Sequence, residues 1–230
     1  MAFDLQTFRT RALSAIIFVV VMLGAIFYSI DSFIILFSIV YTGCLIEYNN
    51  LIKNTPTIHT KTAKLLYSLF GLMYMTISFC AIKHLASAHW IAVLGTTAYY
   101  VLPMLVIVSI WINDTMAYIV GSFIGKTPLS ALSPKKTWEG TIGGALLAVV
   151  AVVLLGRSLT GLSYQTLIIV SATSAIMGTM GDLIESKFKR MAGVKDSGNI
   201  MPGHGGFFDR FDSLLLAGPT VWLILTLFAQ

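Results

Sequence analysis

WEGTIGGALLAVVAVVLLG, residues 138–156, is an apolar run in which Glu139 is the one charged residue. A helix that crosses a bilayer needs about 20 mostly apolar residues, so this run is long enough to span one. The whole chain has the same character, with 57% hydrophobic and 11% charged residues, against a usual charged share of about 25%. Its mean hydropathy is +0.85. Because lipid cannot satisfy an open backbone, we predict an all-α, polytopic integral membrane bundle.

Together with this run, the hydropathy of the chain predicts seven spans. They cover residues 12–30, 32–52, 64–82, 90–123, 138–156, 164–188 and 207–229. The fourth is too long for one straight span and contains Pro103 and the polar pair Asn113 and Asp114. It either kinks, leaves the bilayer as a helix, or divides in two, which would give eight spans. Without an internal repeat or a low-complexity linker, we expect a single domain over 1–230, with generic helices over 1–110 and catalytic helices and cytoplasmic loops over 111–230.

The N-terminus resembles a signal peptide, because Arg9 and Arg11 precede an apolar run that begins at Ala12. No A-x-A-like cleavage site follows, and the second predicted span begins at once, which favours an uncleaved first helix. Cys44 and Cys80 both lie in apolar runs. We therefore expect thiols that are buried or face lipid, and neither a disulfide nor a metal site.

The basic residues predict the orientation of the chain. If the N-terminus is cytoplasmic and seven spans alternate, all of the 15 Lys and Arg residues except Lys83 and Arg157 lie on the cytoplasmic side. This distribution is typical of membrane proteins and explains the net charge of +5 without nucleic acid as a partner. An eighth span would break the alternation unless the extra element were re-entrant.

Charge is concentrated in KRMAGVKDSGNIMPGHGGFFDRFD, residues 189–212, between the last two predicted spans. On the preceding helix, small residues recur at spacings of three and four and lead to Asp182 and Glu185. Small residues alone are explained by close helix packing. Carboxylates inside a span are costly and are functional candidates by default. We expect both to point into the bundle near its cytoplasmic end.

Asp209 and Asp212 are three residues apart in the first turn of the last predicted helix, where the helix dipole favours carboxylates. The apolar run that follows is short, so we expect Asp209 to lie level with Asp182. Two carboxylates from two helices make a hard oxygen site for Mg²⁺. The alternative is a structural ion pair of the aspartate with Arg210 or Lys189.

A third polar segment is GKTPLSALSPKKTWEGTIGG, residues 125–144. Thr137 is placed to N-cap the fifth span, and the free N–H groups there, with Lys135 and Lys136, favour a phosphate. Two lysines in a cytoplasmic loop are equally expected from the positive-inside rule. A stripe on the fourth segment, formed by Asp114, Tyr118, Gly121 and Gly125, either lines a polar cavity or packs tightly.

The segment SKFKRMAGVKDSGNIMPGHGGFFDRFD, residues 186–212, resembles the signature of the phosphatidate cytidylyltransferase (CDP-diacylglycerol synthase) family. The segments NDTMAYIVGSFIGKTPLSALSPKKTWEG, residues 113–140, and MGDLIES, residues 180–186, resemble the same family. The resemblance covers about 113–213. It implies a membrane homodimer, in the bacterial inner membrane with a cytoplasmic active site, that uses Mg²⁺ to convert CTP and phosphatidate to CDP-diacylglycerol and pyrophosphate.

The resemblance also implies roles for individual residues. Asp182 and Asp209 would hold the metal, and Lys189, Asp196 and Asp212 would belong to the same polar centre, with a second monovalent cation such as K⁺ as an option. The remaining phosphate charge would be neutralised by a set of basic residues: Lys135, Lys136, Lys189, Arg190, Lys195 and Arg210. The nucleotide contact would lie in Ser133, Pro134, Lys135, Lys136, Thr137 and Trp138. His204 either binds a phosphate or shapes the turn between its flanking glycines.

Two other functions are compatible with the same residues. A CTP-dependent lipid kinase would use similar metals but transfer the γ-phosphoryl group. An ion-coupled transporter would use Asp114, Asp182 and Glu185 as a relay, although such sites usually lie near the midplane between repeats.

Overall fold

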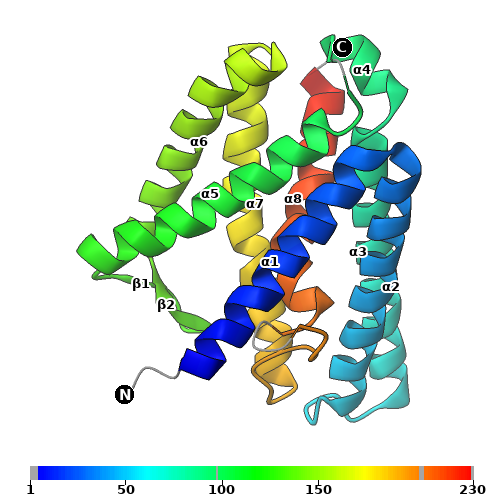
Figure 1. Cartoon of the computed structure of the whole chain (residues 1–230). Helices are drawn as coiled ribbons and strands as arrows, with labels where there is room; N and C mark the ends of the chain where they lie inside the picture. Colours follow the sequence, from blue (N-terminus) through cyan, green and yellow to red (C-terminus); the bar gives the residue numbers. More distant parts are fainter. Residues whose placement is uncertain (1–4, 97, 202–204, 229–230) are drawn as a thin grey trace. The chain divides into compact units, whose positions relative to one another are not determined.

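The computed structural model describes residues 5–96, 98–201 and 205–228, with side chains from residue 12 onward. Within these ranges the chain forms eight helices and one two-stranded hairpin. The elements are α1 (Leu5–Tyr28), α2 (Ile30–Asn54), α3 (Lys61–Leu85), α4 (Ala88–Leu94), α5 (Val101–Ile124), β1 (Pro128–Ser130), β2 (Ser133–Thr137), α6 (Trp138–Thr160), α7 (Tyr164–Met191) and α8 (Phe207–Phe228) (Figure 1).

Six of these helices are long and apolar enough to cross a membrane: α2, α3, α5, α6, α7 and α8. The apolar part of α1, Ala12–Tyr28, is somewhat shorter. The predicted fold class, an all-α polytopic membrane protein, is confirmed. Six of the seven predicted spans each correspond to one long helix of the structure, and the fourth takes in most of the long helix α5 and part of the short helix α4.

The fourth predicted segment, 90–123, divides into α4 and α5. α4 ends at Gly95, whose φ of 64° is a left-handed conformation that terminates a helix. A helix of 7 residues is about 10 Å long, far short of the ~30 Å apolar core of a bilayer. α4 therefore adds no eighth span in the described part of the chain. Pro103 lies in the first turn of α5, where its missing N–H is tolerated, and not at a kink.

The chain forms two compact units that interleave in sequence. The first consists of the described part of Met1–Thr76 together with Phe188–Phe211, and the second of Ile77–Lys187 together with Asp212 and the rest of α8. α3, α7 and α8 each contribute residues to both units. The expected single domain over 1–230 stays a prediction.

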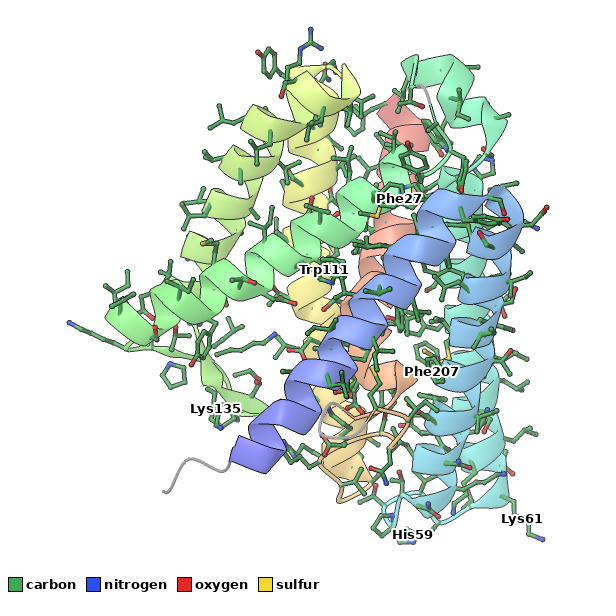
Figure 2. All side chains as sticks on the ribbon, viewed as in Figure 1. Phe27, His59, Lys61, Trp111, Lys135 and Phe207 are labelled. Carbon is green, nitrogen blue, oxygen red and sulfur yellow. The ribbon has the colours of Figure 1, made fainter. Side chains whose placement is uncertain are left out.

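In the first unit, α1 and α2 form a helical hairpin around Ser29, which N-caps α2 in a capping box with Ser32. Tyr48 lies edge-on to Phe188 and to Phe208, with ring centroids 5.1 and 5.9 Å away. These rings join α2 to the end of α7 and to the start of α8. Figure 2 labels Phe207, the first residue of α8.

Packing of Phe207 also depends on α2. Its ring lies against Gly43, where a Cβ would overlap the ring. Cys44 is buried and Cys80 is exposed, and the structure places no disulfide between them.

In the second unit, α5 packs on α6 through glycines. A Cβ on Gly140 would lie 2.6 Å from Ala117 O, and one on Gly144 would lie 2.7 Å from Ala117 N. The chain between the two helices, expected to be a loop, is the antiparallel β1–β2 hairpin. Figure 1 shows the hairpin at the end of the α5–α6 pair. Close helix packing and this short hairpin fix the start of α6 beside the end of α5.

Candidate functional site

Three carboxylates of the second unit converge. Asp182 and Glu185 lie on α7 and Asp212 lies on α8, and each offers an oxygen within 4.8 Å of the others. Glu185 is 1% exposed and Asp212 is 8% exposed. The two acids on α7 are three residues apart and therefore share a face of the helix. The predicted orientation of Asp182 and Glu185 into the helix bundle is confirmed for the second unit.

Lys136 forms an ion pair with Asp182. It lies on β2, where successive side chains point to opposite faces, so that its neighbour Lys135 is exposed (Figure 2). Ser133 begins the same strand and Trp138, the first residue of α6, is 51% exposed. The hairpin therefore directs one lysine at the carboxylates and leaves the other accessible.

The start of α6 is held by two side chains. Thr137 is the N-cap, as predicted, and its hydroxyl accepts a hydrogen bond from Gly140 N at 3.2 Å. Glu139 accepts from Lys126 N and Thr127 N, each at 3.2 Å. The polar segment that leads into the fifth predicted span is thus anchored at both ends of the hairpin.

The polar stripe on α5 contributes mainly to packing. A Cβ on Gly121 would lie 3.1 Å from Thr137 Oγ1, and one on Gly125 would lie 2.6 Å from it. Tyr118 and Asp114 are exposed. The neighbouring Asn113 is buried, and its amide donates to Thr179 Oγ1 at 3.4 Å. Of the two interpretations of this stripe, the glycines favour tight packing.

The carboxylate cluster has the chemistry of a metal site. Carboxylate oxygens are the ligands that hard divalent cations such as Mg²⁺ prefer. Asp182, Glu185 and Asp212 bring such oxygens from two helices to within 4.8 Å of one another. Burial of several carboxylates together is costly unless cations compensate them. The residues present therefore fit a divalent cation.

Asp209 belongs to the first unit, where it is surrounded by donors. Lys189 Nζ lies 2.8 Å from Oδ1, and the N–H groups of Ser197 and Gly206 both donate to Oδ2 at 2.8 Å. The Ser197 hydroxyl lies 2.8 Å from the same oxygen. The predicted alternative, an ion pair of Asp209 with Lys189, is present in the structure. The predicted metal pair of Asp182 with Asp209 joins residues of different units and stays a prediction.

The other predicted site residues of 189–212 point outward. Arg190, Lys195, Asp196 and Arg210 are exposed, and Arg190 donates to Val194 O at 3.2 Å. His204 lies outside the described residues, so both interpretations of it stay predictions. The assignments of these side chains to phosphate binding or to the polar centre also stay predictions.

Two acidic residues, Glu185 and Glu47, lie among the candidate site residues but were not in the predicted set. Glu185 was expected to point into the bundle, but it was not assigned a metal-binding role. Glu47, on α2, accepts hydrogen bonds from Ser197, Phe207 and Phe208. The signal for Glu47 was its position inside the second predicted span, where a carboxylate is a functional candidate by default.

The chain is similar in sequence to a family of known proteins and to individual curated members. The profile of the cytidylyltransferase family matches residues 57–228. A protein of Staphylococcus haemolyticus named phosphatidate cytidylyltransferase is 44% identical over 129 residues, which cover 55% of this chain and 49% of that protein. The phosphatidate cytidylyltransferase of Bacillus subtilis is 44% identical over 124 residues, covering 53% of this chain and 46% of that protein.

A third relative, the phosphatidate cytidylyltransferase of Thermotoga maritima, is 43% identical over 129 residues, covering 53% of this chain and 47% of that protein. The chain thus matches about half the length of these curated relatives. The family match itself extends over most of the chain, from the segment that follows α2 to the end of α8. This chain belongs to the cytidylyltransferase family.

Proposed function

We propose that this chain is a phosphatidate cytidylyltransferase, which converts CTP and phosphatidate to CDP-diacylglycerol and pyrophosphate in phospholipid biosynthesis. The observation that carries the proposal is the cluster of Asp182, Glu185 and Asp212 beside Lys136, in a chain of membrane-spanning helices. Acids that bind a metal, with a cation next to them, suit a nucleoside triphosphate. The names of the curated relatives support the same reaction.

The metal in this proposal is Mg²⁺, held by Asp182 with Asp212 and Glu185 of the same unit and by Asp209. When bound, Mg²⁺ neutralises phosphate oxygens and the charge of the pyrophosphate leaving group. Asp209 would have to exchange Lys189 for the metal at Oδ1, because Lys189 Nζ lies 2.8 Å from that oxygen. A second, monovalent cation such as K⁺ belongs to the proposal as an option.

The β1–β2 hairpin is the proposed CTP contact. Lys135 is exposed and accessible to the polyphosphate, whereas Lys136, on the same strand, forms an ion pair with Asp182. Trp138 offers an exposed indole ring at the start of α6. The N-terminal end of α6 adds the positive end of its dipole. Triphosphate charge would thus be distributed between the hairpin and the metal. Arg190, Lys195 and Arg210 would neutralise the remainder, together with Lys189 once the metal replaces it at Asp209.

The transfer itself needs little covalent chemistry from the protein. A phosphate oxygen of phosphatidate attacks the α-phosphorus of CTP, a new P–O–P bond forms, and the bond from the α-phosphorus to the bridging oxygen of the β-phosphate breaks. A phosphate monoester is already largely ionised near pH 7, so no strong base is needed. The chain's tasks are to position two anions and to screen their repulsion.

The location of the protein follows from its helices and its charges. The apolar helices make it an integral membrane protein. We place it in the bacterial inner membrane with the active site on the cytoplasmic side, because the Lys- and Arg-rich segments favour that side. Bilayer lipid would then supply phosphatidate at headgroup level. A homodimer is the assembly that the family resemblance implies.

Labelled CTP tests the proposed reaction. The purified protein in detergent, given phosphatidate and Mg²⁺, should place the label of α-³²P-CTP in the lipid and that of γ-³²P-CTP in pyrophosphate. Transfer of the γ label to lipid with release of CDP would establish the lipid kinase instead. Uptake of a solute into proteoliposomes without nucleotide would favour the transporter. The Asp182→Asn variant, for which we expect a kcat lower by about 100-fold or more, is the control for contaminating enzymes.

A further inference from the structure

Glu47 caps a helix that begins far from it in the sequence. Its Oε1 accepts from Phe207 N at 3.0 Å, and its Oε2 accepts from Phe208 N at 2.9 Å. These are the first two residues of α8, whose N–H groups have no partner inside the helix. A carboxylate is also favoured at the positive end of a helix dipole. α2 thus supplies the cap that the sequence around Phe207 lacks.

The same carboxylate is connected to Asp209 through one hydroxyl group. Ser197 Oγ lies 2.8 Å from Glu47 Oε2 and 2.8 Å from Asp209 Oδ2. A serine hydroxyl has one hydrogen to donate, so the two carboxylates share it. Ser197 N donates to Asp209 Oδ2 as well, at 2.8 Å. The position of the Asp209 carboxylate is therefore coupled to that of Glu47.

Glycines leave the room that Glu47 occupies. A Cβ on Gly198 or on Gly206 would overlap the Glu47 carboxylate. Gly205 has a φ of 85°, and a Cβ there would lie 2.5 Å from Asp209 Oδ2. Three glycines of the 189–212 segment thus fit closely around two carboxylates. Such a fit indicates that the chain is arranged to accept Glu47 at this position.

We propose that Glu47 is a positioning residue for Asp209 in cytidylyl transfer, acting through Ser197 and the first turn of α8. This inference rests on the proposed function. Glu47 makes no contact with the substrates in this proposal. It holds the N–H groups and the hydroxyl that orient Asp209. Glu47 also lies before the region matched by the family, residues 57–228. In this proposal α2 therefore helps to build the site.

Glu47→Gln tests the proposal in the full-length protein reconstituted in nanodiscs. The amide keeps the shape but places an NH₂ group against Phe208 N–H or Phe207 N–H. We expect kcat to fall about tenfold, because Asp209 loses the orientation that Glu47 imposes through Ser197 and the first turn of α8. The KM for CTP should change less than about twofold, and the Mg²⁺ concentration for half-maximal activity should rise. Hydrogen exchange at the Phe207 and Phe208 amides should become faster.

Asp31→Asn is the matched control, because it removes a carboxylate from the opposite end of α2, where Asp31 is exposed. It should leave activity and Mg²⁺ dependence unchanged. Ser197→Ala serves as a second variant if Glu47→Gln does not fold. It keeps the backbone N–H to Asp209 and removes only the shared hydroxyl, so we expect a smaller fall in kcat in the same direction.

The outcomes separate the inference from the proposed function. Unchanged amide exchange at Phe207 and Phe208 in Glu47→Gln would overturn the cap. Faster exchange with unchanged kcat and Mg²⁺ dependence would overturn the positioning role and leave the reaction intact. A rise in the KM for CTP with kcat unchanged would also contradict it. If the unaltered protein forms no CDP-diacylglycerol, both the proposed function and the inference fail.

Discussion

Lys189 Nζ lies 2.8 Å from Asp209 Oδ1, and the two side chains are 13% and 5% exposed. Removing one partner of a buried ion pair leaves the other charge uncompensated, which costs about 3–5 kcal/mol. A divalent cation at Asp209 would compensate that charge in place of the lysine. We therefore expect Lys189→Met to lower the thermal midpoint of unfolding in detergent. Mg²⁺ should raise the midpoint of this variant by more than it raises the midpoint of the unaltered protein.

Lys187→Met is the control for this comparison, because Lys187 is exposed on the same helix. It should change neither the midpoint nor its response to Mg²⁺. Differential scanning fluorimetry over a Mg²⁺ titration measures both. An equal Mg²⁺ response in Lys189→Met and in the unaltered protein would assign Asp209 to a structural ion pair and remove it from the metal site.

Asp182 is the carboxylate that both the sequence and the ion pair with Lys136 single out. Asp182→Asn keeps the size of the side chain and removes its charge. If Asp182 holds Mg²⁺, the loss of several kcal/mol of transition-state stabilisation should lower kcat by about 100-fold or more. Measured pyrophosphate release gives this value, and size-exclusion chromatography checks that the variant is folded. Robust Mg²⁺-dependent turnover in Asp182→Asn would contradict the metal assignment.

The fold followed from hydropathy because the bilayer imposes one simple constraint on every span. Every predicted run coincides with most of a long helix, and the fourth also takes in part of the short helix α4. The division of 90–123 was less certain, since both α4 and α5 are apolar and hydropathy alone does not separate them. The break depends on the left-handed conformation at Gly95. The β1–β2 hairpin was missed because its two strands, of three and five residues, are short and show no clear alternation of apolar and polar side chains.

The sequence predicted site residues only where a charged side chain in an apolar helix carries a high free-energy cost. Asp182 and Glu185 stood out because carboxylates are rare in apolar helices. Glu47 satisfies the same criterion, but no other acidic residue lies within the second predicted span, whereas the acidic residues of the C-terminal half occur in clusters. Its partners are also backbone groups of Phe207 and Phe208, which any sequence would offer. Helical periodicity relates near neighbours and carries no information on a contact across 160 positions.

The adjacent lysines of β2 should differ in their kinetic roles. Lys135 is exposed and in this proposal contacts only CTP. Lys135→Ala should therefore raise the KM for CTP roughly fivefold, the effect of losing one exposed charge pair, and should change kcat little. Lys136 pairs with Asp182, so Lys136→Ala should lower kcat about tenfold or more. Steady-state kinetics separate the two constants, and Lys61→Ala, on the exposed start of α3, is the control. Identical kinetic effects at both lysines would contradict this division.

Close packing of α5 on α6 depends on Gly144, where a Cβ would lie 2.7 Å from Ala117 N and from Asn113 O. Backbone cannot yield as a flexible side chain does, so Gly144→Ala should separate the helices at a cost of about 1–3 kcal/mol. Because α6 begins at the β1–β2 hairpin, activity should fall as well. Gly24→Ala is the control, since nothing lies within 4 Å of a Cβ there and alanine is the better helix former. Denaturant unfolding in micelles measures both variants. If Gly144→Ala is as stable as Gly24→Ala, the glycine contact does not hold the two helices together.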